Sequence, residues 1–273
     1  MNIDLESLSR EQIADRTKKY LINELQERFP DLVGEVSMII VGSIALDVYD
    51  RFSDVDVNIL LSEKVDNLEL KKYKNELKES GSQIELRLAR TYETLERYLN
   101  WNDDFILGEY QNAVVLHDPT KRFSNLIKKF EWYPDDIFVN KVNWLFHEIT
   151  HTIFIDLESL LPDGKGNQYF VNVVKDRLVR YFLTAIRLMN KKFPIHDKKL
   201  YVNTKKLVGE NSDIVRELDE LLLSSDPENI YNAAKYVRKK MENELLTKSL
   251  LEKMNVGEWL NYTSKGDNKI IFE

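Results

Sequence analysis

The stretch from Ile39 to Val57 reads IIVGSIALDVYDRFSDVDV and joins two apolar segments through a glycine-serine pair and two closely spaced aspartates. Val36 to Val41 is apolar and β-branched, and Val55 to Leu61 alternates acidic with apolar residues before becoming fully apolar. Short runs of this kind, bounded by turn residues, are typical of β-strands. The sequence therefore predicts two strands of one sheet connected through Gly42-Ser43.

Further strands and helices on both sides of this stretch complete a predicted α+β domain. Gln83 to Ala89 alternates so that Gln83, Glu85 and Arg87 share one face, which predicts a third strand. Ala113 to Leu116 is apolar and predicts a fourth strand. Helical spacing and capping residues predict helices over Ser9 to Phe29, Leu68 to Ser80, and from Asp118-Pro119 to about Phe130.

The chain changes character near Trp132 to Pro134, after which the apolar pattern is helical nearly throughout. Proline and glycine interrupt that pattern at three places. We therefore predict two domains, residues 1–132 with a mixed sheet and residues 133–273 as an all-α bundle. The predicted helices of the second domain cover Ile137 to Leu161, Tyr169 to Met189, Lys199 to Leu207, Ile214 to Leu223, Ile230 to Thr247 and Leu250 to Leu260.

Composition limits the function classes open to the chain. With 273 residues and 43% hydrophobic content it can bury a substantial core, and without cysteine it has neither disulfides nor thiolate chemistry. Its apolar runs are far shorter than the roughly 20 residues that span a bilayer, and the first residues lack a secretory pattern. We expect a cytoplasmic protein. The net charge of −7 disfavours a polynucleotide partner.

The glycine-serine pair and the acidic residues predict a phosphate and metal site. Gly42 permits close approach of a ligand to the backbone, and Ser43 offers a hydroxyl to phosphate oxygens. Asp54 and Asp56 project from one face of an extended segment, and Glu85 can point the same way from a neighbouring strand. Carboxylates are preferred ligands of Mg²⁺. The alternative is that these acids belong to the solvated side of an amphipathic sheet and that Ser43 is a helix cap.

With Gly-Ser and Asp-x-Asp at this spacing, the sequence resembles the polymerase-beta-like nucleotidyltransferase superfamily. Arg51-Phe52-Ser53-Asp54-Val55-Asp56 is similar to its commonest motif, although the turn after Ser43 lacks an extra glycine often seen there. The resemblance implies Gly42, Ser43, Arg51 and Ser53 at the nucleotide. It also implies Asp54, Asp56 and Glu85 as catalytic ligands of two Mg²⁺ ions, which position the triphosphate and the attacking hydroxyl.

The layout also resembles bacterial antibiotic nucleotidyltransferases that act on aminoglycosides or lincosamides. That resemblance implies transfer of AMP from ATP, or of another nucleoside monophosphate from its triphosphate, to a small hydroxylated acceptor. In such enzymes a glutamate of the helical domain deprotonates the acceptor, a role that would fall to Glu148. Glu85 is the rival general base, and Glu148 can equally be an ordinary helix carboxylate.

Two further interpretations compete with this one. His147-Glu148-Ile149-Thr150-His151 matches the His-Glu-x-x-His pattern of zinc peptidases, but no obvious third ligand follows at the expected distance. A regulatory, antitoxin-like nucleotidyltransferase fold that acts on a protein or RNA partner is the other alternative. Intact acids at positions 54, 56 and 85 argue against an inactive site.

Overall fold

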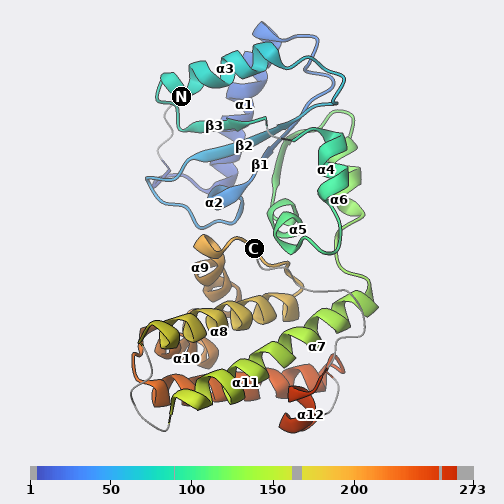
Figure 1. Ribbon diagram of the computed structural model, residues 1–273. Coiled ribbons are helices and arrows are strands. Elements are labelled where there is room, and N and C mark those ends of the chain that lie inside the picture. The colour runs from blue at the N-terminus through green and yellow to red at the C-terminus, as the bar shows by residue number, and fades with distance from the viewer. Residues whose placement is uncertain (1–4, 89, 162–167, 252–253, 263–273) are drawn as a thin grey trace. The chain divides into compact units, whose positions relative to one another are not determined.

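A computed structural model describes residues 5–88, 90–161, 168–251 and 254–262 of the protein. The backbone divides into two compact units, Met1–Glu131 and Trp132–Glu273. The first contains a four-stranded sheet with helices and the second is mostly helical (Figure 1). This arrangement confirms the predicted α+β fold class.

The sheet of the first unit is mixed and has the strand order β3-β2-β1-β4. β1 pairs antiparallel with both β2 and β4, while β2 pairs parallel with β3. All four predicted strands are present. They are β1 (Ser37–Ile40), β2 (Val55–Leu60), β3 (Ile84–Arg87) and β4 (Val114–His117).

One face of the sheet carries the hydrophobic core of this unit. Val55, Val57 and Ile59 of β2 belong to a buried cluster that includes residues of α1 (Arg10–Arg28) and α3 (Leu68–Glu79). Figure 1 draws both helices on the same side of the strands. Because side chains of a strand alternate between faces, Asp56 and Asn58 project from the opposite face.

Shorter helices contact the opposite face of the sheet, and the sequence did not predict two of them. These are α4 (Tyr92–Tyr98) and α5 (Asp104–Gln111). Tyr92 of α4 is hydrogen-bonded to the Ser37 hydroxyl at 2.6 Å, and the Asn58 amide donates to the Tyr110 hydroxyl of α5 at 3.1 Å. The remaining helices of this unit are α2 (Gly42–Ala45) and α6 (Arg122–Lys128).

The second unit is arranged around α8 (Gln168–Met189), against which most of the other described helices of the unit pack. The long helix predicted from Ile137 is interrupted, because α7 (Asp135–His151) continues as the π-helix η1 (Thr152–Leu157) and a short 3-10 turn, η2 (Glu158–Leu160). No helix that the structure describes is both long and apolar enough to cross a membrane. The other helices are α9 (Asp197–Val208), α10 (Asp213–Leu223), α11 (Pro227–Thr247) and α12 (Val256–Leu260).

The end of this unit differs from the predicted helix over Leu250 to Leu260. Only Val256–Leu260 is helical, and residues 252–253 lie outside the described part of the chain. α11 ends at Thr247, two residues before Ser249, whose φ of 56° is in the left-handed region. Asn255 then starts α12 by accepting a hydrogen bond from the Glu258 amide.

Candidate functional site

The glycine-serine turn packs directly on the second aspartate of the motif. Gly42 has a φ of +70°, and a Cβ atom built on it would lie 2.5 Å from Oδ2 of Asp56. The Val41 amide also donates a hydrogen bond to the Asp56 carbonyl at 3.0 Å. Only glycine combines this backbone conformation with this close approach. The turn after β1 and the Asp56 carboxylate of β2 therefore form one compact structure.

Asp56 is a largely buried carboxylate in an acidic neighbourhood. Its side chain is 14% exposed, and Oδ1 lies 2.8 Å from Nη2 of Arg87. This ion pair lacks hydrogen-bond geometry, so the buried Oδ1 has no hydrogen-bond partner within the described residues. Burial raises the pKa of Asp56 to about 6 against the lowering effect of Arg87, and Glu85 and Asp54 raise it further. The positive charge of Arg87 therefore offsets only part of the cost of burying the Asp56 carboxylate among other acids.

Asp54 and Glu85 are near Asp56 in the chain and in the sheet, and both are exposed. Asp54 immediately precedes β2, and Glu85 of β3 is the register partner of Asp56. The predicted sharing of one sheet face by these acids agrees with this register. The described residues nevertheless contain no group of three acidic or histidine side chains placed as a finished metal site.

The donor set has the chemistry that a divalent cation needs. Mg²⁺ binds few carboxylates together with waters and substrate phosphates, so a complete protein cage is not expected. A bound cation would give Oδ1 of Asp56 the partner that it lacks and would lower the raised pKa of this residue. Asp54, Asp56 and Glu85 therefore remain the predicted metal ligands.

The loop before Asp54 has an ordered turn that presents an aromatic ring to solvent. The backbone amide of Asp50 donates a hydrogen bond to the Ser53 hydroxyl at 3.0 Å, and that hydroxyl donates to the Asp50 carboxylate. Arg51 stacks on Phe52 with 4.5 Å between guanidinium and ring centroid, and Phe52 is 78% exposed. Ser43 is half-buried in α2. The nucleotide roles of Ser43, Arg51 and Ser53 stay predictions.

A polar pocket that the sequence did not reveal lies on the same sheet face as the acids. Its volume is about 150 Å³, and we call it the Arg90 pocket. The signal in the sequence is Asn58, a polar residue two positions after Asp56 in an apolar strand. The residues lining the pocket are Asn58, Leu60, Arg87, Arg90 and Glu109.

Glu148 lies in the second unit, on α7, and is half-buried. The Tyr181 hydroxyl of α8 donates to its Oε2 at 3.4 Å. Burial and the negative charge of Glu148 raise the pKa of Tyr181 to about 12, so this tyrosine stays protonated at neutral pH. Glu148 is thus a positioned carboxylate, and its role as general base stays a prediction.

The neighbouring histidines do not form a peptidase-type zinc site with other described residues. His147 donates through Nδ1 to the Trp259 carbonyl at 2.5 Å, and its ring lies 6.1 Å from that of His151. The described part of the chain supplies no third metal ligand beside them. His147 instead connects α7 to α12.

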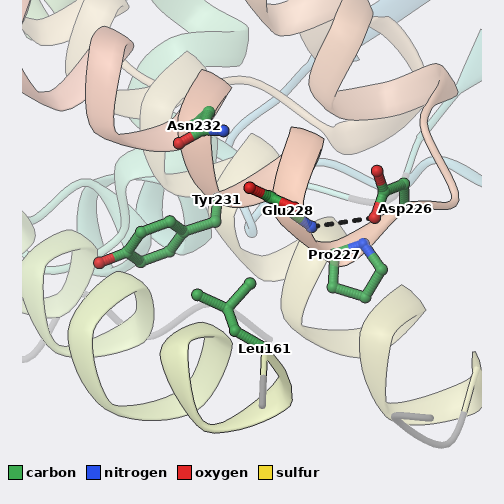
Figure 2. A pocket seen from close by; sticks show the side chains of 6 residues that line it. All are labelled: Leu161, Asp226, Pro227, Glu228, Tyr231 and Asn232. Atoms are coloured by element: carbon green, nitrogen blue, oxygen red, sulfur yellow. Dashed lines mark hydrogen bonds between the residues drawn. The ribbon is translucent and has the colours of Figure 1, made fainter. Parts of the chain in front are cut away.

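A larger hollow of about 410 Å³ lies on the second unit at the start of α11. Figure 2 shows Leu161 opposite Tyr231 and Pro227, with the Asp226 carboxylate accepting from the Glu228 amide. That hydrogen bond caps α11, so it has a structural explanation. None of the predicted site residues lines this hollow. Its lining is Leu161, Asp226, Pro227, Glu228, Tyr231 and Asn232.

Comparison with known proteins places this site within a recognised domain. Residues 18–113 match the family model described as "Nucleotidyltransferase domain", and residues 98–199 match a domain of unknown function, DUF4037. No curated protein matches the chain. A solved nucleotidyltransferase-like protein from Exiguobacterium sibiricum 255-15 is 15% identical, with a TM-score of 0.43 over 88% of this chain and 78% of that one.

The matched segment contains Gly42, Asp54, Asp56 and Glu85 and the lining of the Arg90 pocket, but not Glu148. Neither comparison links the chain to antibiotic-modifying enzymes. Residues 18–113 are therefore similar to a nucleotidyltransferase domain.

Proposed function

We propose that the protein is a Mg²⁺-dependent nucleotidyltransferase that transfers a nucleoside monophosphate, AMP from ATP in the first instance, to a hydroxyl of a small acceptor. The observation that supports this most is the packing of Asp56 on Gly42, with Asp54 and Glu85 beside it. A structural carboxylate at this position would be expected to have full hydrogen-bond satisfaction. Asp56 instead has an unmatched buried oxygen and a raised pKa.

In the proposed reaction the acceptor oxygen forms a bond to the α-phosphorus while the bond from that phosphorus to the bridging oxygen breaks and pyrophosphate leaves. Asp54, Asp56 and Glu85 would hold Mg²⁺, and the chemistry that the ion would supply is neutralisation of phosphate charge and activation of the hydroxyl. Ser43 and Gly42 would hold phosphate oxygens, with Arg51 and Ser53 at the edge of the nucleotide. Glu148 or Glu85 would accept the proton of the attacking hydroxyl.

We further assign residues 1–132 as the catalytic domain and residues 133–273 as the acceptor-binding domain. The nucleotidyltransferase match to residues 18–113 supports the first assignment. Two observations support the second assignment. Glu148 is a positioned carboxylate on α7, and the helical half of the sequence lacks the phosphate-binding motif. Aminoglycosides and lincosamides remain in the panel of acceptors to be tested.

The test is incubation of the full chain with Mg²⁺, each nucleoside triphosphate and a panel of hydroxylated acceptors, with pyrophosphate release and adduct mass as readouts. Asp54→Asn and Asp56→Asn should abolish transfer while circular dichroism remains unchanged. Asp47→Asn is the matched control because Asp47 is an exposed aspartate of the same loop, outside the acidic group. Full activity in either site variant would refute the metal assignment.

A further inference from the structure

The Arg90 pocket opens directly beside the catalytic carboxylates. Asp56 and Asn58 are two residues apart on β2, so they share a face and lie about 6.6 Å apart along the strand. Their register partners on β3 are Glu85 and Arg87. Arg87 belongs to both places, because it pairs with Asp56 at 2.8 Å and also lines the pocket. A ligand group in this pocket is therefore a neighbour of the acidic site.

The pocket has a rigid polar floor. Asn58 is 8% exposed and Tyr110 only 2%. The Tyr110 hydroxyl accepts hydrogen bonds from the Asn58 amide at 3.1 Å and from Nη1 of Arg90 at 3.2 Å. Burying polar groups costs free energy unless they are hydrogen-bonded, and these hydrogen bonds satisfy the buried groups. The floor fixes Arg90 in place before any ligand arrives.

Arg90 is held in a partly buried position by several contacts at once. Its guanidinium lies 3.6 Å from Glu109 and near the rings of Tyr98 and Tyr110, at 5.8 and 5.6 Å from their centroids. A guanidinium has five N–H donors in a planar fork, so these contacts leave donors for a ligand. The arginine is thus oriented by its neighbours and keeps N–H donors for a ligand.

The charge and size of the pocket select the ligand chemistry. Two guanidiniums, Arg87 and Arg90, line the pocket with one carboxylate, Glu109, and Arg87 also pairs with Asp56 at its edge. Guanidinium forks match the oxygens of phosphate and carboxylate groups, and they repel cations. A volume of about 150 Å³ equals roughly five waters of liquid, below the roughly 300 Å³ of a pocket for a whole small molecule. One anionic group fits, whereas a nucleoside does not.

We propose that the Arg90 pocket binds a phosphate or carboxylate group of the acceptor, so that the acceptor is a hydroxylated anion. This inference rests on the proposed nucleotidyl transfer. The phosphate-binding turn at Gly42 packs on Asp56, so the nucleotide is expected at that end of β2. Asn58 and Leu60 lie farther along β2, away from Gly42, and the pocket that they line is therefore assigned to the acceptor. A polycationic aminoglycoside is the least suitable acceptor for two arginines.

The first arm of the test measures the anion site without any reaction. Inorganic phosphate is titrated calorimetrically into the full chain in the absence of nucleotide, and Arg90→Met should abolish the binding seen in the wild type. Arg90→Lys keeps the charge and should retain part of it. Arg97→Met is the matched control, since Arg97 is a 70% exposed arginine of α4 that pairs with Glu63. Thermal melting of each variant verifies that it folds.

The second arm measures transfer to a hexose, the same hexose bearing a phosphate, and an aminoglycoside. We expect the phosphorylated hexose to have the lowest KM, and Arg90→Met to raise that KM by roughly tenfold to a hundredfold without changing the KM for Mg²⁺-nucleotide. Equal KM values for the neutral and phosphorylated hexose would overturn the proposal. A parallel loss of nucleotide affinity in Arg90→Met would overturn it too, by assigning the pocket to the nucleotide's phosphates.

The two arms also separate this proposal from the transferase itself. Phosphate binding that survives Arg90→Met refutes the pocket even if transfer is observed. Phosphate binding that is lost in Arg90→Met, with no transfer to any acceptor, keeps the anion site and refutes the proposed function.

Discussion

Oδ2 of Asp56 lies 2.5 Å from the point that a Cβ atom on Gly42 would occupy. The glycine of the motif is therefore explained by the aspartate of the next strand, since any side chain at residue 42 displaces the carboxylate. Local backbone conformation adds to this, because the φ of Gly42 is +70°. The two parts of the motif, ten residues apart, require one another sterically.

A glycine-to-alanine series separates these two effects. Gly34→Ala has open space and should change the free energy of unfolding by less than about 0.5 kcal/mol. Gly81→Ala has open space but a φ of +67° and should cost about 1 kcal/mol. Gly42→Ala adds the clash with Asp56 and should cost about 2–4 kcal/mol. Urea denaturation measures all three, and equal costs at positions 42 and 81 would contradict the steric argument.

The pKa of Asp56 predicts how stability varies with pH. Burial, opposed by Arg87 and reinforced by Glu85 and Asp54, raises this pKa from 3.8 to about 6. Folding therefore takes up a proton between these values, and the free energy of unfolding falls as pH rises from about 4 to about 6. The loss is on the order of 2–3 kcal/mol. Urea midpoints across this pH range should show it.

Asp56→Asn should remove that slope and make the protein more stable than wild type at pH 8, while abolishing transfer. Such an opposition between stability and activity is common at catalytic sites. Asp54→Asn is the control, because Asp54 is exposed and its replacement leaves the buried Asp56 carboxylate in place, so most of the slope should remain. An unchanged pH profile in Asp56→Asn would assign the slope to other carboxylates.

The sequence was sufficient for the long or strictly alternating elements. The strands around Asp54-Val55-Asp56 were predictable because alternation of polar and apolar residues with a period of two indicates a strand with one buried face. Two short helices of seven and eight residues, Tyr92–Tyr98 and Asp104–Gln111, were missed because they contain too few turns to establish a period. The Arg90 pocket was missed with them, since Tyr110 reaches it from the second of these helices.

Side-chain hydrogen bonds of Asp118 explain why α6 begins later than predicted. Asp118-Pro119 predicted a helix start, yet the helix begins at Arg122. Asp118 accepts hydrogen bonds from the Ser124 amide and hydroxyl, at 2.9 and 2.6 Å, while Lys121 takes a φ of 57°. The aspartate thus caps the helix from outside its first turn. A side chain bonded six residues ahead leaves no signal in local spacing.

Glu148→Gln should test the general base of the proposed reaction. Removing a general base lowers kcat by roughly 10²- to 10⁴-fold, whereas the KM for nucleotide should stay nearly constant. Tyr181→Phe removes the 3.4 Å hydrogen bond to Glu148 and should have a smaller effect on kcat. Glu158→Gln, an exposed carboxylate of η2, is the control. Unchanged kcat in Glu148→Gln, with slow turnover in Glu85→Gln, would assign the base to Glu85.

The histidines of α7 should prove structural rather than zinc-binding. His147 donates to the carbonyl of Trp259, whose indole is fully buried and packs on Phe146 at 5.1 Å between ring centroids. His147→Asn should therefore cost about 1 kcal/mol of stability by weakening the attachment of α12. His151→Asn should cost less, because the described residues show no bond from His151 to α12. Metal analysis of the purified protein should find far less than one zinc per chain. Stoichiometric zinc that is lost in both variants would instead establish a metal site on α7.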